Sequence, residues 1–186
     1  MDIHQLCQRY SNGERFKYLY FWSHKQKEPA SIITKSCFSQ WYPSHFNIDG
    51  IDYVTAEHYM MAEKARLFND QKMLQDILNA NNPGLAKALG RQITGFIPKI
   101  WEEQCLSIVI KGNLAKFSQN QQLANFLLAT QQRILVEASP IDNIWGIGLS
   151  QDAPNIDNPL TWCGKNLLGF ALMAVREKLS TCFKHS

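Results

Sequence analysis

The sequence predicts an α+β fold: a single compact, mostly α-helical domain with a small β-sheet. Its 186 residues are 45% hydrophobic and 11% aromatic, which suits one sizeable core and excludes disorder. Apolar residues recur at helical spacing in most long segments, and short aromatic or branched runs between them are typical of strands. Because no repeat or boundary interrupts this pattern, we expect one domain over residues 1–186, with its core at about 18–180.

Composition and charge indicate which classes of partner the protein is expected to bind. The net charge of +3 comes without a Lys/Arg run of the kind that marks a nucleic-acid arm, although a phosphorylated small molecule needs only a few local cations. The five cysteines are an odd set without CxxC spacing, so we expect free, mostly buried thiols in a reducing compartment. No apolar run approaches the roughly 18 residues of a membrane span, and the polar start is unlike a signal peptide. We therefore expect a cytoplasmic protein with no membrane partner.

The first third of the chain is predicted to be a loose lead-in, a strand and a hairpin. Residues 1–15 are polar, and Tyr18–Trp22 has strand composition, with Phe21 near its end as a possible ligand contact. We expect residues 23–33 to form a surface connection. Residues 46–53 alternate on both sides of Asp49-Gly50, the signal for a hairpin with a type I′ turn.

A helix is expected from Ala56, with Thr55 as its N-cap. Glu57 and Lys64 fall inside its apolar stripe, where charges are costly unless they are paired or line a cavity, so both are site candidates. A structural ion pair, or a helix turned so that both charges lie at its rim, is the alternative. The helical wheel divides the other residues into two groups: Met60, Met61, Leu67 and Phe68 on the stripe, against Tyr59, Ala62, Glu63 and Arg66.

The remaining elements follow from periodicity, caps and breakers. We expect a helix at 71–79, a short helix ending at Gly90-Arg91, a long central helix at 100–117, a helix at 121–130, a strand at 133–138 and a final helix from about 165.

The loop from Ser139 to Gly164, about 25 residues long, is too long for a mere connection and is expected to be functional. Asp142 stands three residues before Trp145, and a carboxylate beside a flat indole suits chemistry that generates a cationic sugar. An Asx turn is the alternative for Asp142. Gly146 and Gly148 expose backbone, but their spacing fits neither a dinucleotide fingerprint nor a P-loop.

Two basic residues are candidates for an anion. Lys165, in Gly164-Lys165-Asn166 before the last helix, lies where a helix N-terminus favours negative charge, and a glycine turn with a solvated lysine is the alternative. Arg91 could meet a phosphate or remain solvated. His58 points about 100° away from Glu57, and no second His or Cys stands at ligand spacing, so we predict no metal and no cofactor.

The order of these pieces resembles one family. The chain has an aromatic strand, a hairpin, Thr55-Ala-Glu57-His58-Tyr59 continuing to Ala-Glu-Lys64, Gly90-Arg91, a Trp opening a long helix, Asp142-x-x-Trp145-Gly-x-Gly148, and Gly164-x-Asn166-x-Leu-Gly. Over about residues 18–180 this is similar to the YbiA-like NADAR family, formerly a domain of unknown function, which includes the riboflavin-biosynthesis-intermediate N-glycosidase. The departures are Phe38-Ser39-Gln40-Trp41, where the family commonly shows Ser-Asn-Phe, and an insertion at 150–162.

The resemblance implies a site and an activity. Catalysis would involve Glu57, Lys64, Trp101, Asp142 and Trp145, while substrate would be bound by Phe21, Arg91, Gly146, Gly148, Lys165 and Asn166. The implied reaction is hydrolysis of the C–N glycosidic bond of phosphoribosylamino-pyrimidine intermediates of riboflavin biosynthesis, releasing ribose 5-phosphate. Two alternatives stay open: removal of ADP-ribose from guanine bases of nucleic acid, and a non-catalytic module that binds ADP-ribose or a nucleotide.

Overall fold

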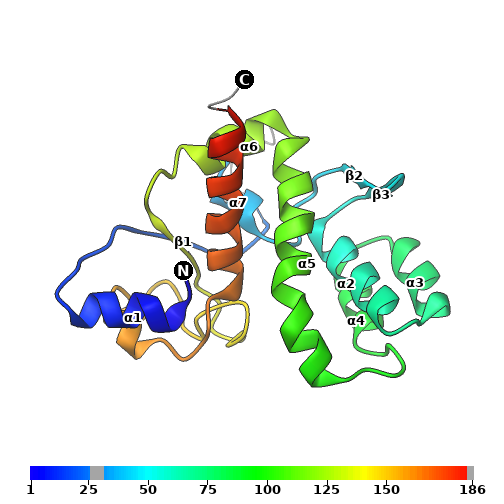
Figure 1. Cartoon of the computed structure of the whole chain (residues 1–186), viewed down its shortest axis with the longest axis horizontal. Helices are drawn as coiled ribbons and strands as arrows, with labels where there is room; N and C mark the ends of the chain where they lie inside the picture. Colours follow the sequence, from blue (N-terminus) through cyan, green and yellow to red (C-terminus); the bar gives the residue numbers. More distant parts are fainter. Residues whose placement is uncertain (26–31, 184–186) are drawn as a thin grey trace. The chain divides into compact units, whose positions relative to one another are not determined.

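Helices dominate the computed structural model, which describes residues 1–25 and 32–183 (Figure 1). The strands within these residues are short and form two-stranded sheets, so the predicted α+β class, mostly helical with little sheet, is confirmed. The chain divides into two units. Unit 1 combines Met1–Ser39 with Ala124–Ser186, and unit 2 is Gln40–Leu123.

Unit 1 is built around a parallel strand pair. β1 (Tyr18–Phe21) lies beside β4 (Ile134–Glu137), with Tyr18 opposite Ile134 and Phe21 opposite Glu137. Helix α7 (Leu167–Phe183) packs against β4, and the 3-10 turn η1 (Lys35–Phe38) packs against β1. Both strands and the last helix agree with the predicted elements, and the parallel pairing brings residues far apart in the sequence side by side.

The predicted loose lead-in is wrong, because residues Ile3–Ser11 form helix α1. Asp2 and Gln5 make a capping box, in which each side chain accepts a hydrogen bond from the other residue's backbone N–H. Leu6 is fully buried in a cluster with Ile134, Val136 and other apolar residues of unit 1. Leu6 is the buried residue that holds this helix in unit 1. The helix was not predicted because the residues around Leu6 are mostly polar.

Unit 2 is a hairpin followed by packed helices. Its hairpin joins β2 (Phe46–Ile48) to β3 (Ile51–Tyr53), and positive φ angles of 54° at Asp49 and 81° at Gly50 confirm the predicted type I′ turn. The helices are α2 (Ala56–Leu67), α3 (Gln71–Leu78), α4 (Pro83–Gly90), α5 (Pro98–Ser118) and the first residues of α6 (Gln121–Leu128), which ends in unit 1.

Helix α2 is the centre of unit 2, and its predicted one-sided apolar stripe is wrong. Tyr59 and Ala62, assigned to the opposite side, are at most 1% exposed. The reason is that α3, α4 and α5 all pack against α2, so its first turns are covered on every side (Figure 1). Thr55 caps the helix as predicted, accepting a hydrogen bond from the His58 amide.

The long loop after β4 contains one short regular element, the 3-10 turn η2 (Pro159–Thr161). Within it the Trp162 indole donates to the Ile156 carbonyl at 2.7 Å, and Tyr20 of β1 donates to Asp157 at 2.6 Å. The segment 150–162, expected to be an insertion, is thus held by hydrogen bonds within unit 1.

Other expectations can be compared with the described residues. Part of the predicted surface connection at 23–33 lies outside them, as does the side chain of Cys182. Among the other cysteines, all of them free thiols, Cys37 and Cys105 are buried, Cys7 is half-buried and Cys163 is exposed. Within the described residues, no helix combines the length and the apolar character that a bilayer crossing requires.

Candidate functional site

Helix α2 carries the first predicted catalytic group, Glu57, in its first turn. The Glu57 side chain is 5% exposed, and its backbone N–H donates to the Gln40 carbonyl at 3.0 Å. The positive end of the helix dipole favours a carboxylate at this position. Unit 2 therefore holds a buried acidic group at a helix start, as the sequence predicts.

Lys64 lies two turns further along α2, against aromatic rings. Its Nζ donates to the Gly90 carbonyl at 2.7 Å and lies 4.2 Å from the centroid of Phe96 and 5.6 Å from that of Trp101. Burial lowers the pKa of the Lys64 ammonium, and the positive charge of Arg91 lowers this pKa further. The alternative in which both charges lie at the rim of the helix fits Lys64, which is half-buried, but not Glu57, which is buried. The lowered pKa makes the Lys64 amine easier to deprotonate than a solvated lysine.

Unit 2 thus brings together three of the predicted site residues, Lys64, Arg91 and Trp101. Arg91 follows directly on Gly90, whose carbonyl holds Lys64, and its exposed guanidinium at the end of α4 is within electrostatic reach of the amine. Trp101, in the first turns of α5, is half-buried.

Phe96 is the member of this group that sequence reasoning missed. It precedes α5, is 40% exposed, and contacts Phe68 with a centroid separation of 5.2 Å as well as Lys64. The available signal in the sequence was a large aromatic residue between Gly95 and Pro98, just before the long helix. Phe96 forms an aromatic wall beside the amine.

The loop after β4 carries the second predicted carboxylate, Asp142. One carboxylate oxygen, Oδ1, accepts from the amides of Ile144 at 2.9 Å and Trp145 at 2.8 Å, which is the Asx turn considered as the alternative. Oδ2 makes no hydrogen bond within residues 1–25 and 32–183, and Asp142 is only half-buried. The turn fixes the carboxylate beside Trp145 and leaves one oxygen available for chemistry.

Backbone hydrogen bonds join this loop to the start of α7. Lys165 donates to Asn143, Asn166 to Gly146 and Leu168 to Trp145, at 3.0 to 3.1 Å. They bring the exposed Lys165 to the loop of Asp142 and Trp145, so unit 1 gathers its predicted site residues on two adjoining segments.

Asn166 and the two loop glycines have structural roles that the sequence did not suggest. Asn166 is fully buried and bridges the backbone of β4, accepting from Glu137 N at 3.0 Å and donating to Leu135 O at 2.9 Å. A Cβ at Gly146 would lie 2.8 Å from the Glu137 carbonyl, and Gly148 has a φ of +68°. These structural roles explain the presence of Asn166, Gly146 and Gly148 without a ligand. Their contact with substrate stays a prediction.

Phe21 requires a correction. Its side chain is 1% exposed and packs edge-on against Phe38 at a centroid separation of 5.5 Å, so the structure places it in the core and not at a ligand surface. Burial does not alternate along β1, since its first three residues, Tyr18–Tyr20, are all half-buried, and packing against Phe38 of η1 encloses Phe21. Trp22, which follows it, is 48% exposed.

His58 is held by the fold on both sides of its ring. Nδ1 pairs with the Thr55 hydroxyl at 2.7 Å and Nε2 with the Ala80 carbonyl at 3.1 Å. Burial lowers the pKa of this imidazole, so its role is that of a neutral hydrogen-bonding bridge. The described residues contain no group of three or more His, Cys, Asp or Glu side chains arranged to hold a metal.

Comparison with known proteins defines the class. A model of the NADAR domain matches residues 20–180, so the chain belongs to the NADAR family. An N-glycosidase of Acanthamoeba polyphaga mimivirus is 43% identical over 171 residues, covering 89% of this chain and 98% of that protein. N-glycosidase YbiA of Escherichia coli strain K12 is 34% identical over 143 residues, covering 77% and 81%.

The NMR structure of Escherichia coli YbiA has a TM-score of 0.74 to this chain at 28% identity, covering 93% of this chain and 90% of that one. The resemblance to YbiA-like proteins is therefore confirmed in sequence and in fold. With relatives of this similarity, the protein is an enzyme of the N-glycosidase class.

Proposed function

We propose that this enzyme hydrolyses the C–N glycosidic bond of phosphoribosylamino-pyrimidine intermediates of riboflavin biosynthesis and releases ribose 5-phosphate. The N-glycosidase relatives support the bond type, and the residues of the two units support the chemistry. The observation that carries the proposal furthest is the desolvated amine of Lys64 beside Phe96 and Trp101.

Lys64 acts as the nucleophile in this proposal. Its neutral amine attacks C1 of the ribose, the bond from C1 to the amino-pyrimidine breaks, and the departing nitrogen takes a proton from an acid. The sugar ring then opens to a protonated imine on Lys64. Water adds to the imine carbon, which releases the aldehyde form of ribose 5-phosphate and regenerates the amine.

Glu57 and Asp142 supply the acid and the base. A buried carboxyl such as Glu57 is suited to proton transfer, whereas the half-exposed Asp142, oriented by its Asx turn, is suited to stabilising positive charge that develops on the sugar. Each unit also supplies an exposed cation that suits a phosphate, Arg91 in unit 2 and Lys165 in unit 1, and an indole that suits a flat pyrimidine, Trp101 in unit 2 and Trp145 in unit 1.

A direct substrate comparison tests the proposal. The purified enzyme is incubated with a phosphoribosylamino-pyrimidine and, in parallel, with a guanine-containing oligonucleotide bearing ADP-ribose, and the released base and sugar phosphate are measured by mass spectrometry. We expect turnover of the first substrate to ribose 5-phosphate. Turnover restricted to the ADP-ribosylated oligonucleotide would replace this substrate assignment by the alternative one.

A further inference from the structure

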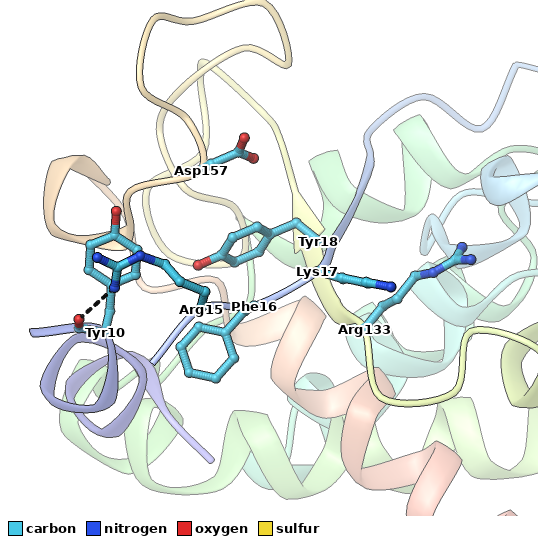
Figure 2. Close-up of a pocket in the computed structure, with 7 residues that line it drawn as sticks. All are labelled: Tyr10, Arg15, Phe16, Lys17, Tyr18, Arg133 and Asp157. Carbon is cyan, nitrogen blue, oxygen red and sulfur yellow. Dashed lines mark hydrogen bonds between the residues drawn. The ribbon is translucent and has the colours of Figure 1, made fainter. Parts of the chain in front are cut away.

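Unit 1 contains a cavity of about 470 Å³ that the proposed reaction does not use. Its volume is within the range of small-molecule sites. The residues around it come from the end of α1, the segment before β1 and its first residue, the residue before β4, and the loop after β4. They are Tyr10, Arg15, Phe16, Lys17, Tyr18, Arg133 and Asp157 (Figure 2).

One end of the cavity is lined by two neighbouring cations, Lys17 and Arg133. The register of β1 and β4 pairs Tyr18 with Ile134, and the Ile134 amide donates to the Lys17 carbonyl at 2.9 Å, so Lys17 and Arg133 are neighbours just before these strands. Figure 2 shows both side chains extending to the side opposite the Tyr18 hydroxyl, Arg15 and Tyr10, so these two cations lie at the far end of the cavity from the rings. Neither side chain makes a hydrogen bond or ion pair within residues 1–25 and 32–183. Adjacent like charges repel, and a bound anion would relieve that repulsion.

The other end combines a third cation with aromatic rings. The Arg15 guanidinium lies 4.7 Å from the Tyr10 ring centroid, and one of its nitrogens donates to the carbonyls of Tyr10 and Glu14. A guanidinium has five N–H donors, so several remain for a ligand. Figure 2 shows the Tyr18 hydroxyl pointing to this side of the cavity.

Tyr18 adds a buried polar group without a partner. Its hydroxyl makes no hydrogen bond to any described residue, while its ring is stacked on Tyr20 and meets Trp162 edge-on. Burial raises the pKa of this phenol, so the hydroxyl stays protonated and can donate. A buried unpaired hydroxyl costs free energy that a ligand oxygen would recover.

The cavity is separate in composition from the proposed catalytic residues. None of its lining residues is a predicted catalytic or substrate-binding residue, and five of the seven precede residue 20, where the NADAR match begins. Asp157, already accepting from Tyr20, adds one acidic group that can accept from a hydroxyl. The three cations against one carboxylate leave the cavity positive.

We propose that this cavity is a second binding site, for a phosphorylated small molecule of about mononucleotide size. Its phosphate lies at Lys17 and Arg133, and its sugar or base extends past Tyr18 towards Arg15 and Tyr10. The site binds through charge and hydrogen bonds and takes no part in breaking the glycosidic bond.

Calorimetric titration of the full chain with adenosine 5′-monophosphate tests this site, with adenosine as the ligand that lacks phosphate. We expect saturable binding of the monophosphate and at least tenfold weaker binding of adenosine. The double variant Lys17→Ala/Arg133→Ala should weaken monophosphate binding by about tenfold or more. Tyr18→Phe keeps the ring contacts and should weaken it several-fold.

Two controls locate the ligand. Lys178→Ala removes an exposed lysine of α7 in the same unit and should leave the affinity unchanged. Arg91→Ala/Lys165→Ala removes the proposed phosphate contacts of the catalytic site and should also leave it unchanged. Amide chemical shifts, followed by NMR, should move on ligand addition mainly at residues 10–18 and 133.

Three results would overturn the proposal: absence of binding by the wild-type protein, an unchanged affinity in Lys17→Ala/Arg133→Ala, or loss of binding in Arg91→Ala/Lys165→Ala. Thermal unfolding of each variant shows whether it is folded. If the double variant is not folded, the single Lys17→Gln variant and the wild-type chemical-shift map decide by the same criteria. Because these readouts are affinities and shifts, they are independent of whether the substrate proposed above is correct.

Discussion

Glu57 and Asp142 differ in their surroundings although both are predicted catalytic carboxylates. Glu57 is buried at the start of α2, while Asp142 is half-exposed and bound to its own loop. Because a lost acid/base group usually costs a factor of 10² to 10⁴, Glu57→Gln and Asp142→Asn should each lower kcat by at least about a hundredfold. Steady-state kinetics on variants with unchanged circular dichroism measure this.

Asp142→Asn needs a control because the side chain also holds the Asx turn. Asn keeps an oxygen that can accept from the amides of Ile144 and Trp145, so this variant preserves the turn, whereas Asp142→Ala removes it. Near wild-type turnover in a folded Asp142→Asn would assign Asp142 a purely structural role. The same result for Glu57→Gln would remove Glu57 from the catalytic set.

At Lys64 the expected intermediate can be trapped. Borohydride added during turnover should reduce an imine and leave a covalent adduct on Lys64, heavier by the reduced sugar phosphate, which peptide mass spectrometry locates. Lys64→Arg keeps the positive charge but forms no imine at neutral pH, so its turnover should fall by at least about a hundredfold.

Two results together would contradict the nucleophile assignment: no adduct on Lys64 and substantial activity in Lys64→Arg. The amine would then act as an electrostatic clamp on the substrate, and water would attack the sugar directly. Lys72→Arg, at an exposed lysine of α3 in the same unit, is the matched control and should leave turnover unchanged.

Among the elements, α2 carries Lys64 and α5 carries Trp101, and these two helices pack closely against each other. A Cβ at Gly112 of α5 would overlap the ring of Tyr59 on α2, which is 1% exposed and packed against the rings of Phe46 and Tyr53. Gly112→Ala should therefore destabilise the protein by roughly 1–3 kcal/mol, even though alanine favours a helix. Chemical denaturation measures the change in free energy of unfolding.

A double-mutant cycle separates overpacking from other effects. Tyr59→Leu makes room at the crossing and is destabilising on its own, but adding Gly112→Ala to it should cost less than adding Gly112→Ala to the wild type. Additive effects of the two substitutions would show that the overlap at Tyr59 is not the cause.

For the whole molecule, the lowered pKa of Lys64 links stability to pH. The folded state binds fewer protons at Lys64 than the unfolded state does between the lowered pKa and the ordinary value of 10.5, so this residue's contribution to stability rises with pH across that window. Compared with Lys64→Met, the wild-type free energy of unfolding should therefore increase as the pH is raised. Denaturation of both proteins at several alkaline pH values measures the difference, and a parallel pH dependence of the two would contradict it.

The sequence by itself determined the local elements and the family. Asp49-Gly50 predicted the turn because both positions need positive φ, Thr55 predicted the start of α2, and the motif order identified the NADAR domain. Such features depend on neighbouring residues, whose preferences act before the chain folds.

Only the tertiary structure decided which side chains are enclosed. Periodicity predicted one apolar face for α2, but packing by three helices buried its first turns on all sides. Periodicity also assigned no role to Phe96, although that ring lies beside Lys64. Helix α1 was not predicted because its composition is mostly polar, and the burial of Leu6 is seen only in the folded structure. The second cavity exists only because the pairing of β1 with β4 places Lys17 next to Arg133. Burial depends on contacts between segments far apart in the chain, and the spacing of apolar residues within one segment does not reveal these contacts.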